Sequence, residues 1–318
     1  MRAASRTAAV REATASEVRR VLAGRRRDLA GTALRILLLL SLVLALAVLI
    51  ILLLEVARTA IPVLQDRGVQ IFESGYSSLP ERAGVKQGLI GSIYIMVFVI
   101  VIAFPLGIGA AIYMEEYARD TALTRFINTN IRNLAGVPAI VYGILGLAIF
   151  VELFGPITGP GSTQGHSLMA GGLTIAVMVL PIVIITTAEA LRAVPRSIRE
   201  GGFGVGATRW EVVRSHVLPN AAPGILTGSV LSMARTLGET APLIMVGAVT
   251  GFLATREGVL VQLQERFTSL PTLIFTYVKK PQQEYQDLAS AAILVLIVLI
   301  FGVNLVAILL RNRYERKW

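Results

Sequence analysis

The chain has 318 residues, of which 54% are hydrophobic and only 16% are charged, well below the roughly 25% usual for soluble domains. This composition indicates an integral membrane protein. With no cysteine, the chain cannot form disulfides or thiolate metal sites, and it has no cysteine nucleophile. The net charge of +10 is concentrated at the two ends, which favours cytoplasmic termini rather than binding to nucleic acid.

Charge-free apolar stretches predict six membrane-spanning helices, because a span needs roughly 20 apolar residues. The predicted spans are residues 36–54, 89–114, 133–151, 168–188, 221–250 and 288–310. Six spans return the chain to its starting side, as two basic ends require. The expected fold is all-α. Its predicted parts are a basic cytoplasmic tail (1–34), a first transmembrane helix (35–57), an external loop (58–87), a core (88–311) with a cytoplasmic loop at 189–220, and a second cytoplasmic tail (312–318).

The cytoplasmic loop contains the most distinctive polar segment, EGGFGVGATRWEVVRSHVLP at residues 200–219. It contains two matches to the capping-box pattern S/T-x-x-E, formed by Ser197 with Glu200 and by Thr208 with Glu211. Gly206 predicts a left-handed C-cap between two short helices, and Pro219 predicts the end of the second helix. The loop is therefore expected to be a compact helical hairpin that serves as a docking surface at the membrane face.

The fifth predicted span contains two charged residues, Arg235 and Glu239, which lie four residues apart and hence on one helical face. Each costs on the order of 3 kcal/mol inside a membrane, so both are expected to face protein or water. A guanidinium suits a tetrahedral oxyanion because its planar fork donates two parallel hydrogen bonds. A carboxylate accepts a hydrogen bond from monohydrogen phosphate, whereas sulfate has no hydrogen to donate. The pair predicts a substrate path that distinguishes phosphate from sulfate. The alternative is a salt bridge that only neutralises itself.

Other polar residues in the predicted spans have more ordinary explanations. Thr236 and Thr240 are candidate hydroxyl donors to the same path, although each is expected to bond the carbonyl four residues earlier in its own helix. Asn304 is expected to form an interhelical hydrogen bond, and Glu189 to be a solvated residue at the membrane interface.

No catalytic or cofactor-binding motif accompanies these features. None of the four lysines lies in G-x-x-x-x-G-K-[ST], so the chain lacks this ATP-binding motif. H-E-x-x-H and G-x-S-x-G are also absent, and the two histidines are too isolated to predict a metal site. The chain is expected to be a non-catalytic membrane subunit without a cofactor. If nucleotide powers transport, a partner must hydrolyse it.

The hairpin resembles the E-A-A-x3-G-x9-I-x-L-P cytoplasmic loop of binding-protein-dependent ABC importer permeases. The spacing matches, but Gly201 and Gly202 replace the two alanines and His216 replaces isoleucine. The resemblance implies that this loop docks into an ATPase subunit. The residues it assigns to coupling are Glu200, Gly201, Gly202, Gly206, Ala207, Leu218 and Pro219.

Four further motifs make the resemblance more specific. PLGIGAAIYMEEYA, LAGVPAIVYGILGL, EALRAVPRSIREG and ARTLGETAPL, in this order, resemble the A-type permease (PstA) family of phosphate-specific ABC importers. The match runs from about residue 88 to residue 310 and implies the type I ABC importer permease fold, with a permease core over 88–311 and a coupling-helix hairpin.

The resemblance also implies an inner-membrane location and three protein partners. These are a second permease of the C-type, a dimeric cytoplasmic ATPase and an extracytoplasmic phosphate-binding protein. The alternatives are a permease for sulfate, molybdate or phosphonate, the sister C-type subunit, or an ion-coupled secondary transporter in which Glu239 carries protons. A membrane-tethered DNA binder is disfavoured because the hairpin helices are short and closely flanked by spans.

Overall fold

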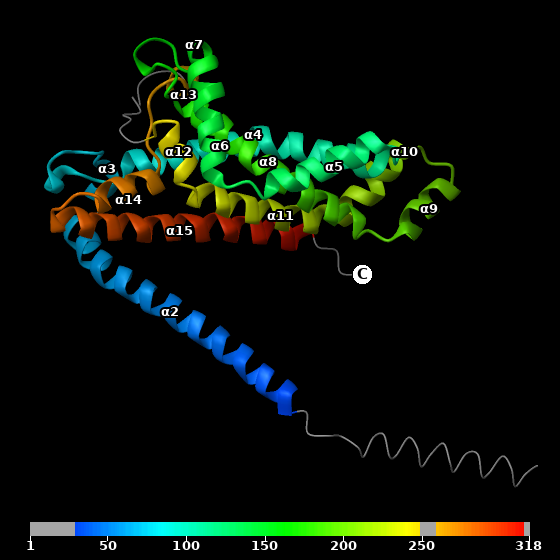
Figure 1. Ribbon diagram of the computed structural model, residues 1–318, viewed down its shortest axis with the longest axis horizontal. Coiled ribbons are helices and arrows are strands. Elements are labelled where there is room, and N and C mark those ends of the chain that lie inside the picture. Colours follow the sequence, from blue (N-terminus) through cyan, green and yellow to red (C-terminus); the bar gives the residue numbers. More distant parts are fainter. Residues whose placement is uncertain (1–28, 249–258, 315–318) are drawn as a thin grey trace, which may run out of the picture. The chain divides into compact units, whose positions relative to one another are not determined.

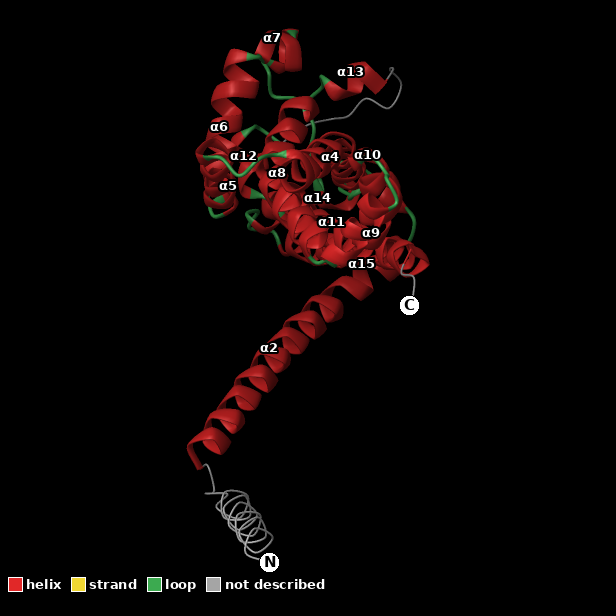
Figure 2. Ribbon diagram, turned by 90° about the vertical axis from the view of Figure 1, so that its right-hand side faces the viewer, coloured by secondary structure: helices red, strands yellow, loops and turns green. Residues whose placement is uncertain are grey.

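A computed structural model describes residues 29–248 and 259–314, and all regular structure within these ranges is helical (Figures 1 and 2). The longer helices are α2 (Leu29–Arg67), α4 (Lys86–Ile112), α5 (Ala122–Ala135), α6 (Ala139–Gly146), α8 (Leu168–Arg192), α9 (Arg196–Gly204), α11 (Leu218–Gly238), α14 (Leu270–Val278) and α15 (Gln283–Tyr314). The short ones are α3 (Gln70–Glu73), α7 (Gly155–Thr158), α10 (Arg209–Val212), α12 (Ala241–Met245) and α13 (Val259–Leu263). Three π-helical stretches, η2 (Tyr113–Tyr117), η3 (Leu147–Leu153) and η5 (Val213–Val217), extend α4, α6 and α10.

Five helices in the described residues are long and apolar enough to cross a membrane, and a bent pair brings the number to six if it counts as one span. The all-α class is thereby confirmed, and the six predicted spans correspond to these five helices and the bent pair. The long helices are Leu29–Arg67, Lys86–Tyr117, Leu168–Arg192, Arg209–Gly238 and Gln283–Arg313, and the bent pair joins Ala122–Ala135 to Ala139–Leu153.

Two predicted spans are interrupted by proline. The span predicted at 133–151 is wrong as a continuous helix, because α5 ends at Ala135 and the chain turns by 102° before α6. The span predicted at 221–250 is also wrong, because α11 ends at Gly238; residues 249 and 250 lie outside the described part. In both cases the break lies about four residues before a proline, Pro138 or Pro242. A proline ring clashes with the carbonyl at that position in a continuous helix.

The main core lies around α8, which packs against α4 and α11. Small residues bring these helices close. A Cβ on Gly107 of α4 would lie 2.7 Å from Val183, and one on Gly228 of α11 would lie 2.4 Å from Thr186. On its other side α11 packs along α15, so it lies between α8 and α15 (Figure 1).

A second core joins α14 and α15 to the loop that follows α3. Tyr277 is fully buried, and its hydroxyl donates a 2.8 Å hydrogen bond to the Gly84 carbonyl. The Tyr277 ring packs against Tyr76 and Tyr285, and the Lys280 ammonium lies 3.7 Å from the Tyr285 ring centre. These contacts pack the end of the bundle that lies opposite α9 and α10.

The chain divides into two compact units, residues 1–55 and 56–318. The described part of the first unit is the beginning of α2, whose leucine-rich side chains are exposed. An apolar helix with exposed side chains all round is the form that lipid accommodates. The helix is longer than predicted, since α2 continues to Arg67 into the region expected to be an external loop.

Candidate functional site

Arg235 and Glu239 form an ion pair where α11 ends. The Arg235 Nε donates to Glu239 Oε1 at 3.0 Å, and the two side chains are 41% and 19% exposed. Arg235 is in the last turn of the helix, where a cation is favoured by the helix dipole, whereas Glu239 already has extended backbone angles. The predicted pairing is confirmed, although Glu239 is the residue after the helix rather than part of it. Both partners retain accessible surface.

The Arg235 side chain shares one face of α11 with Gly224, Thr227 and Leu231, and all four residues are exposed. Their spacing of three and four residues is that of a single helical stripe. A second stripe of α11, formed by Gly228, Ser232 and Thr236, is buried. An accessible strip therefore runs from the hairpin end of α11 up to the ion pair.

The two threonines behave differently from each other. Thr236 is buried, and its hydroxyl donates to the Ser232 carbonyl at 2.9 Å, which confirms the expected bond to its own helix. Thr240 makes no such bond within the described residues, because it follows the end of α11 and its backbone does not continue that helix. Thr240 is half-buried, whereas Thr236 is buried.

The segment after the break is held in place by close contacts. A Cβ on Gly143 of α6 would lie 2.7 Å from the Pro242 Cα, so glycine allows α12 to pack directly on α6. The His166 Nδ1 lies 2.9 Å from the Val246 carbonyl, so this nitrogen carries the hydrogen and donates it. Gly247, at φ +92°, completes the turn under the imidazole. These contacts fix α12 and, through it, Glu239 and Thr240.

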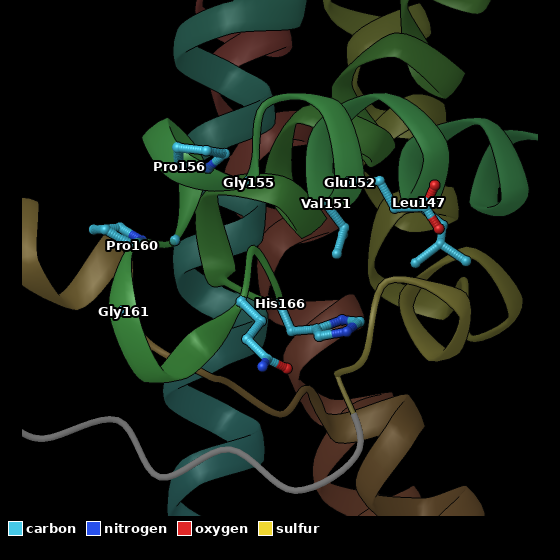
Figure 3. A pocket seen from close by; sticks show the side chains of 10 residues that line it. Leu147, Val151, Glu152, Gly155, Pro156, Pro160, Gly161 and His166 are labelled. Carbon is cyan, nitrogen blue, oxygen red and sulfur yellow. The ribbon is translucent and has the colours of Figure 1, made fainter.

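His166 also lines a cavity of 550 Å³ at this end of the bundle (Figure 3). Its wall consists mainly of η3 and the glycine- and proline-rich loop that follows, and it includes the exposed carboxylate of Glu152. No group of three metal-ligating side chains occurs among the residues that the structure describes.

The predicted cytoplasmic hairpin consists of α9 and α10. Thr208 and Glu211 form the predicted capping box, with the Thr208 amide donating to Glu211 Oε2 at 2.7 Å. Gly206 has φ +82° and lets the Ala207 amide bond the Gly202 carbonyl, so the predicted left-handed C-cap is confirmed. The hairpin therefore has the expected shape.

Two predicted details of the hairpin are wrong. Ser197 does not form a capping box with Glu200, because α9 begins at Arg196 directly after Pro195 and Ser197 is already helical. Pro219 does not end the second helix. It lies in the first turn of α11 and follows the π-helical stretch η5, whose wider turn accommodates the proline ring. Residues 209–238 consequently run as one helical segment.

The residues assigned to coupling are mostly accessible. Glu200, Gly201, Gly206 and Pro219 are exposed, Ala207 and Leu218 are half-buried, and Gly202 is buried. Sequence reasoning missed three large apolar side chains that the hairpin also exposes: Phe203 at 47%, Val205 at 84% and Trp210 at 56%. The hairpin surface is thus both charged and apolar.

Sequence reasoning also missed how the hairpin is fastened to the bundle. Arg199 of α9 binds Glu116 of η2 at 2.7 Å, in a pair whose side chains are only 20% and 8% exposed. The same guanidinium donates to the carbonyls of Leu191 and Val194, at 2.8 and 2.9 Å. Arg199 and Glu116 are too far apart in sequence for a local pattern to reveal their pairing.

A second pair lies beside the first. Arg192, at the end of α8, binds Glu115 through two hydrogen bonds, one of them 2.9 Å from Nε to Oε2. The Arg209 guanidinium lies 5.8 Å from the Tyr117 ring centre. The side chains of both ion pairs and Arg209 are among those that line a cavity of 590 Å³ between η2 and the hairpin.

Comparison with known proteins places these features in a wider group. Residues 103–318 match the family model "Binding-protein-dependent transport system inner membrane component". The chain is 34% identical to the phosphate transport system permease protein PstA of Yersinia pestis, over 70% of this chain and 71% of that protein. It is also 34% identical to the probable ABC transporter permease protein YqgI of Bacillus subtilis, but spans only 59% of that relative's length. Among solved structures, a bacterial ABC transporter involved in the import of alginate superimposes with a TM-score of 0.63 at 15% identity, covering 93% of this chain and 100% of that one.

Proposed function

Because the chain belongs to the family of binding-protein-dependent transport system inner membrane components, we propose that it is a permease subunit of an ATP-driven importer of inorganic phosphate. It is a multi-pass membrane protein with the fold of a type I ABC importer permease. Its similarity to phosphate permeases and the charged pair on the accessible strip of α11 both support phosphate as the cargo.

The observation that carries the proposal is the Arg235–Glu239 pair at the break after α11. Arg235 is accessible, permanently cationic and oriented by Glu239, so it presents a forked donor to a passing oxyanion. Glu239 accepts a hydrogen bond from the hydroxyl of monohydrogen phosphate. Sulfate lacks this hydrogen, so Glu239 repels it, and the pair selects phosphate. Thr240 is accessible for a further hydrogen bond, whereas Thr236 lies on the buried side.

The hairpin is the proposed docking element for a cytoplasmic ATPase dimer. Glu200 and Gly201 lie on its exposed surface, and Phe203, Val205 and Trp210 add the apolar area that a stable interface needs. The Arg199–Glu116 pair ties the hairpin to η2 at the end of α4. Movement imposed on the hairpin would thus be passed to the bundle. The chain itself carries out no covalent chemistry, and hydrolysis takes place in the partner.

The remaining partners follow from the same proposal. A second permease, of the C-type, completes the path, and a phosphate-binding protein delivers the cargo at the outer face, near the cavity lined by Glu152 and His166. In this proposal both termini lie in the cytoplasm, an orientation that the basic ends of the chain favour.

The test is reconstitution of the complete transporter in vesicles, with Arg235→Ala and Glu200→Lys compared side by side. Arg235→Ala is expected to abolish phosphate uptake while the ATPase still co-purifies, whereas Glu200→Lys is expected to lose the ATPase. The control for loss of one positive charge is Arg214→Ala, because Arg214 is exposed and lies on the hairpin side. Identical defects in the two variants would refute this division of roles.

Two further measurements separate this function from its alternatives. Uptake driven by a pH gradient without the ATPase would support an ion-coupled transporter instead. In Glu239→Gln, phosphate is expected to lose its advantage over sulfate. If the selectivity for phosphate over sulfate is unchanged in this variant, the Glu239 carboxylate does not distinguish the two anions.

A further inference from the structure

A cavity of 660 Å³ lies between α8, α11 and α15, in the half of the bundle next to the hairpin. Its walls have helical spacing: Thr186, Glu189 and Ala190 on α8, and Asn304, Ile308 and Arg311 on α15. The wall supplied by α11 includes Gly224, Thr227 and Leu231 of the strip that leads to Arg235. The cavity thus lies on the accessible side of α11, between the hairpin end of this helix and the ion pair.

Two buried polar atoms lack a hydrogen-bond partner among the described residues, and both belong to this cavity. They are the Oδ1 atom of Asn304 and the Nε atom of Arg311. The interhelical hydrogen bond expected for Asn304 is therefore not made by its Oδ1 atom. Buried polar groups are almost always hydrogen-bonded, so two unpartnered atoms beside one cavity point to a missing ligand. Asn304 and Arg311 are seven residues apart and lie on one face of α15.

The cavity is built by small residues rather than by loose packing. A Cβ on Gly224 would lie 2.7 Å from the Ala190 Cβ, and one on Gly228 would lie 2.4 Å from Thr186 Oγ1. Around Gly224 and Gly228, α11 is thus pressed against α8, and the cavity lies where these two helices meet α15. A volume of this size holds a small-molecule ligand.

The polar groups around the cavity define the chemistry of that ligand. Arg311 offers a cationic donor, Asn304 offers an amide, and Glu189 places an exposed carboxylate among the lining residues. The hydroxyls of Thr186 and Thr227 already donate to carbonyls of their own helices, so only their acceptor capacity remains. A ligand that satisfies this set must combine an anionic oxygen with a hydrogen-bond donor.

We propose that this cavity binds a phosphate group whose anionic oxygen accepts a hydrogen bond from Arg311, while the ligand's own hydrogen-bond donor faces the Asn304 Oδ1 atom and the Glu189 carboxylate. Two sources have this chemistry. Inorganic phosphate has an anionic oxygen and a hydroxyl, and it would reach the cavity along α11 from Arg235; this source rests on the proposed function. A phospholipid with an ammonium headgroup has a phosphodiester and an N–H donor, and its chains would lie along the exposed apolar side chains of α15, which include Phe301, Leu305 and Leu309.

The experiment measures binding to the purified full-length chain. One arm uses labelled inorganic phosphate, with sulfate as the comparison anion, in an Arg235→Gln background so that binding at the ion pair does not contribute. The other arm uses native mass spectrometry of the delipidated chain with dioleoyl phosphatidylethanolamine, compared with dioleoylglycerol, which has no phosphate. Binding in the first arm identifies the free ion, and binding only in the second identifies the lipid headgroup.

In whichever arm binding occurs, Arg311→Gln is expected to weaken it at least tenfold. Arg313→Gln removes the same charge from an exposed position on the same helix and should change affinity less than twofold. Asn304→Leu should remain as heat-stable as the parent without ligand, because it removes an unpartnered amide, but should lose the ligand-induced rise in Tm. Absence of binding in both arms, or equal losses in the two arginine variants, would overturn the proposal. Uptake by the reconstituted transporter tests the Arg235 path separately.

Discussion

Two adjacent glycines of α9, Gly201 and Gly202, occupy different environments, so alanine should have different effects at the two positions. Nothing lies within 4 Å of a Cβ built on Gly201. Alanine there should stabilise the exposed helix α9 by about 1 kcal/mol, because glycine has more backbone freedom to lose on folding.

At Gly202 the same gain is offset by crowding. A Cβ would lie 2.8 Å from the Val212 Cγ2, and Val212 is only 1% exposed, so its side chain has little room to move. Overpacking of this kind costs about 1–3 kcal/mol. The net effect of Gly202→Ala is therefore expected to be neutral or destabilising, although the family pattern has alanine at this position.

Hydrogen exchange of the hairpin amides measures this difference. The Val205 and Ala207 amides bond the carbonyls of Gly201 and Gly202, so they report opening of the end of α9. A gain of about 1 kcal/mol slows exchange about fivefold. Gly201→Ala should show this protection, and Gly202→Ala should not.

The double variant Gly202→Ala, Val212→Ala provides the internal check. If the Val212 side chain causes the cost, truncating it should make alanine at position 202 favourable, as a double-mutant cycle would show. Equal protection in Gly201→Ala and Gly202→Ala would refute the packing argument.

Three further predictions concern the fastening of the bundle. Gly143→Ala should displace α12 from α6, because the new Cβ meets the Pro242 backbone, and Tm is expected to fall by several degrees. The control is Gly109→Ala on α4, where the new Cβ would lie in open space and Tm should stay within one or two degrees of the parent value. Glu116→Ala should cost about 3–5 kcal/mol in denaturant unfolding, because it leaves the largely buried Arg199 without its carboxylate, and Glu116→Asp should recover part of the loss. Tyr277→Phe should cost about 1–3 kcal/mol by leaving the Gly84 carbonyl unbonded; no change in the unfolding midpoint would contradict the hydrogen bond.

Features set by neighbouring residues could be predicted from the sequence. The Thr208–Glu211 capping box, the Gly206 turn and the Arg235–Glu239 pairing each involve residues within four positions of one another, and each is present. The six predicted spans also follow from local composition. These are the levels at which propensity and hydrophobic pattern act.

The errors at the two interrupted spans and at Pro219 have a common origin in how proline is accommodated. Pro242 breaks a helix that hydropathy presents as continuous, whereas Pro219 does not break one, because a π-helical stretch precedes it. Proline marks a discontinuity, but the surrounding packing decides whether the chain bends, widens a turn or stops. Sequence alone does not contain that choice.

Contacts between distant segments were likewise beyond prediction. Glu116 and Arg199 are 83 residues apart, and the segment containing Glu116 has nearly balanced charges. The absence of a partner for the Asn304 oxygen is equally a property of the packed bundle. Glycine at position 201 has no structural explanation among the described residues, none of which lies within 4 Å of a Cβ built there.

The continuous helical segment from Arg209 to Gly238 makes the hairpin and the ion pair two ends of one lever. Thirty residues at 1.5 Å each give a rod roughly 45 Å long. A tilt of about 5° at the hairpin end moves the other end by about 4 Å, a distance comparable to the length of a hydrogen bond plus an atomic radius. No loop lies between the two ends to absorb such a motion. A small rotation of a protein bound to the hairpin would therefore be enough to make or break contacts at Arg235.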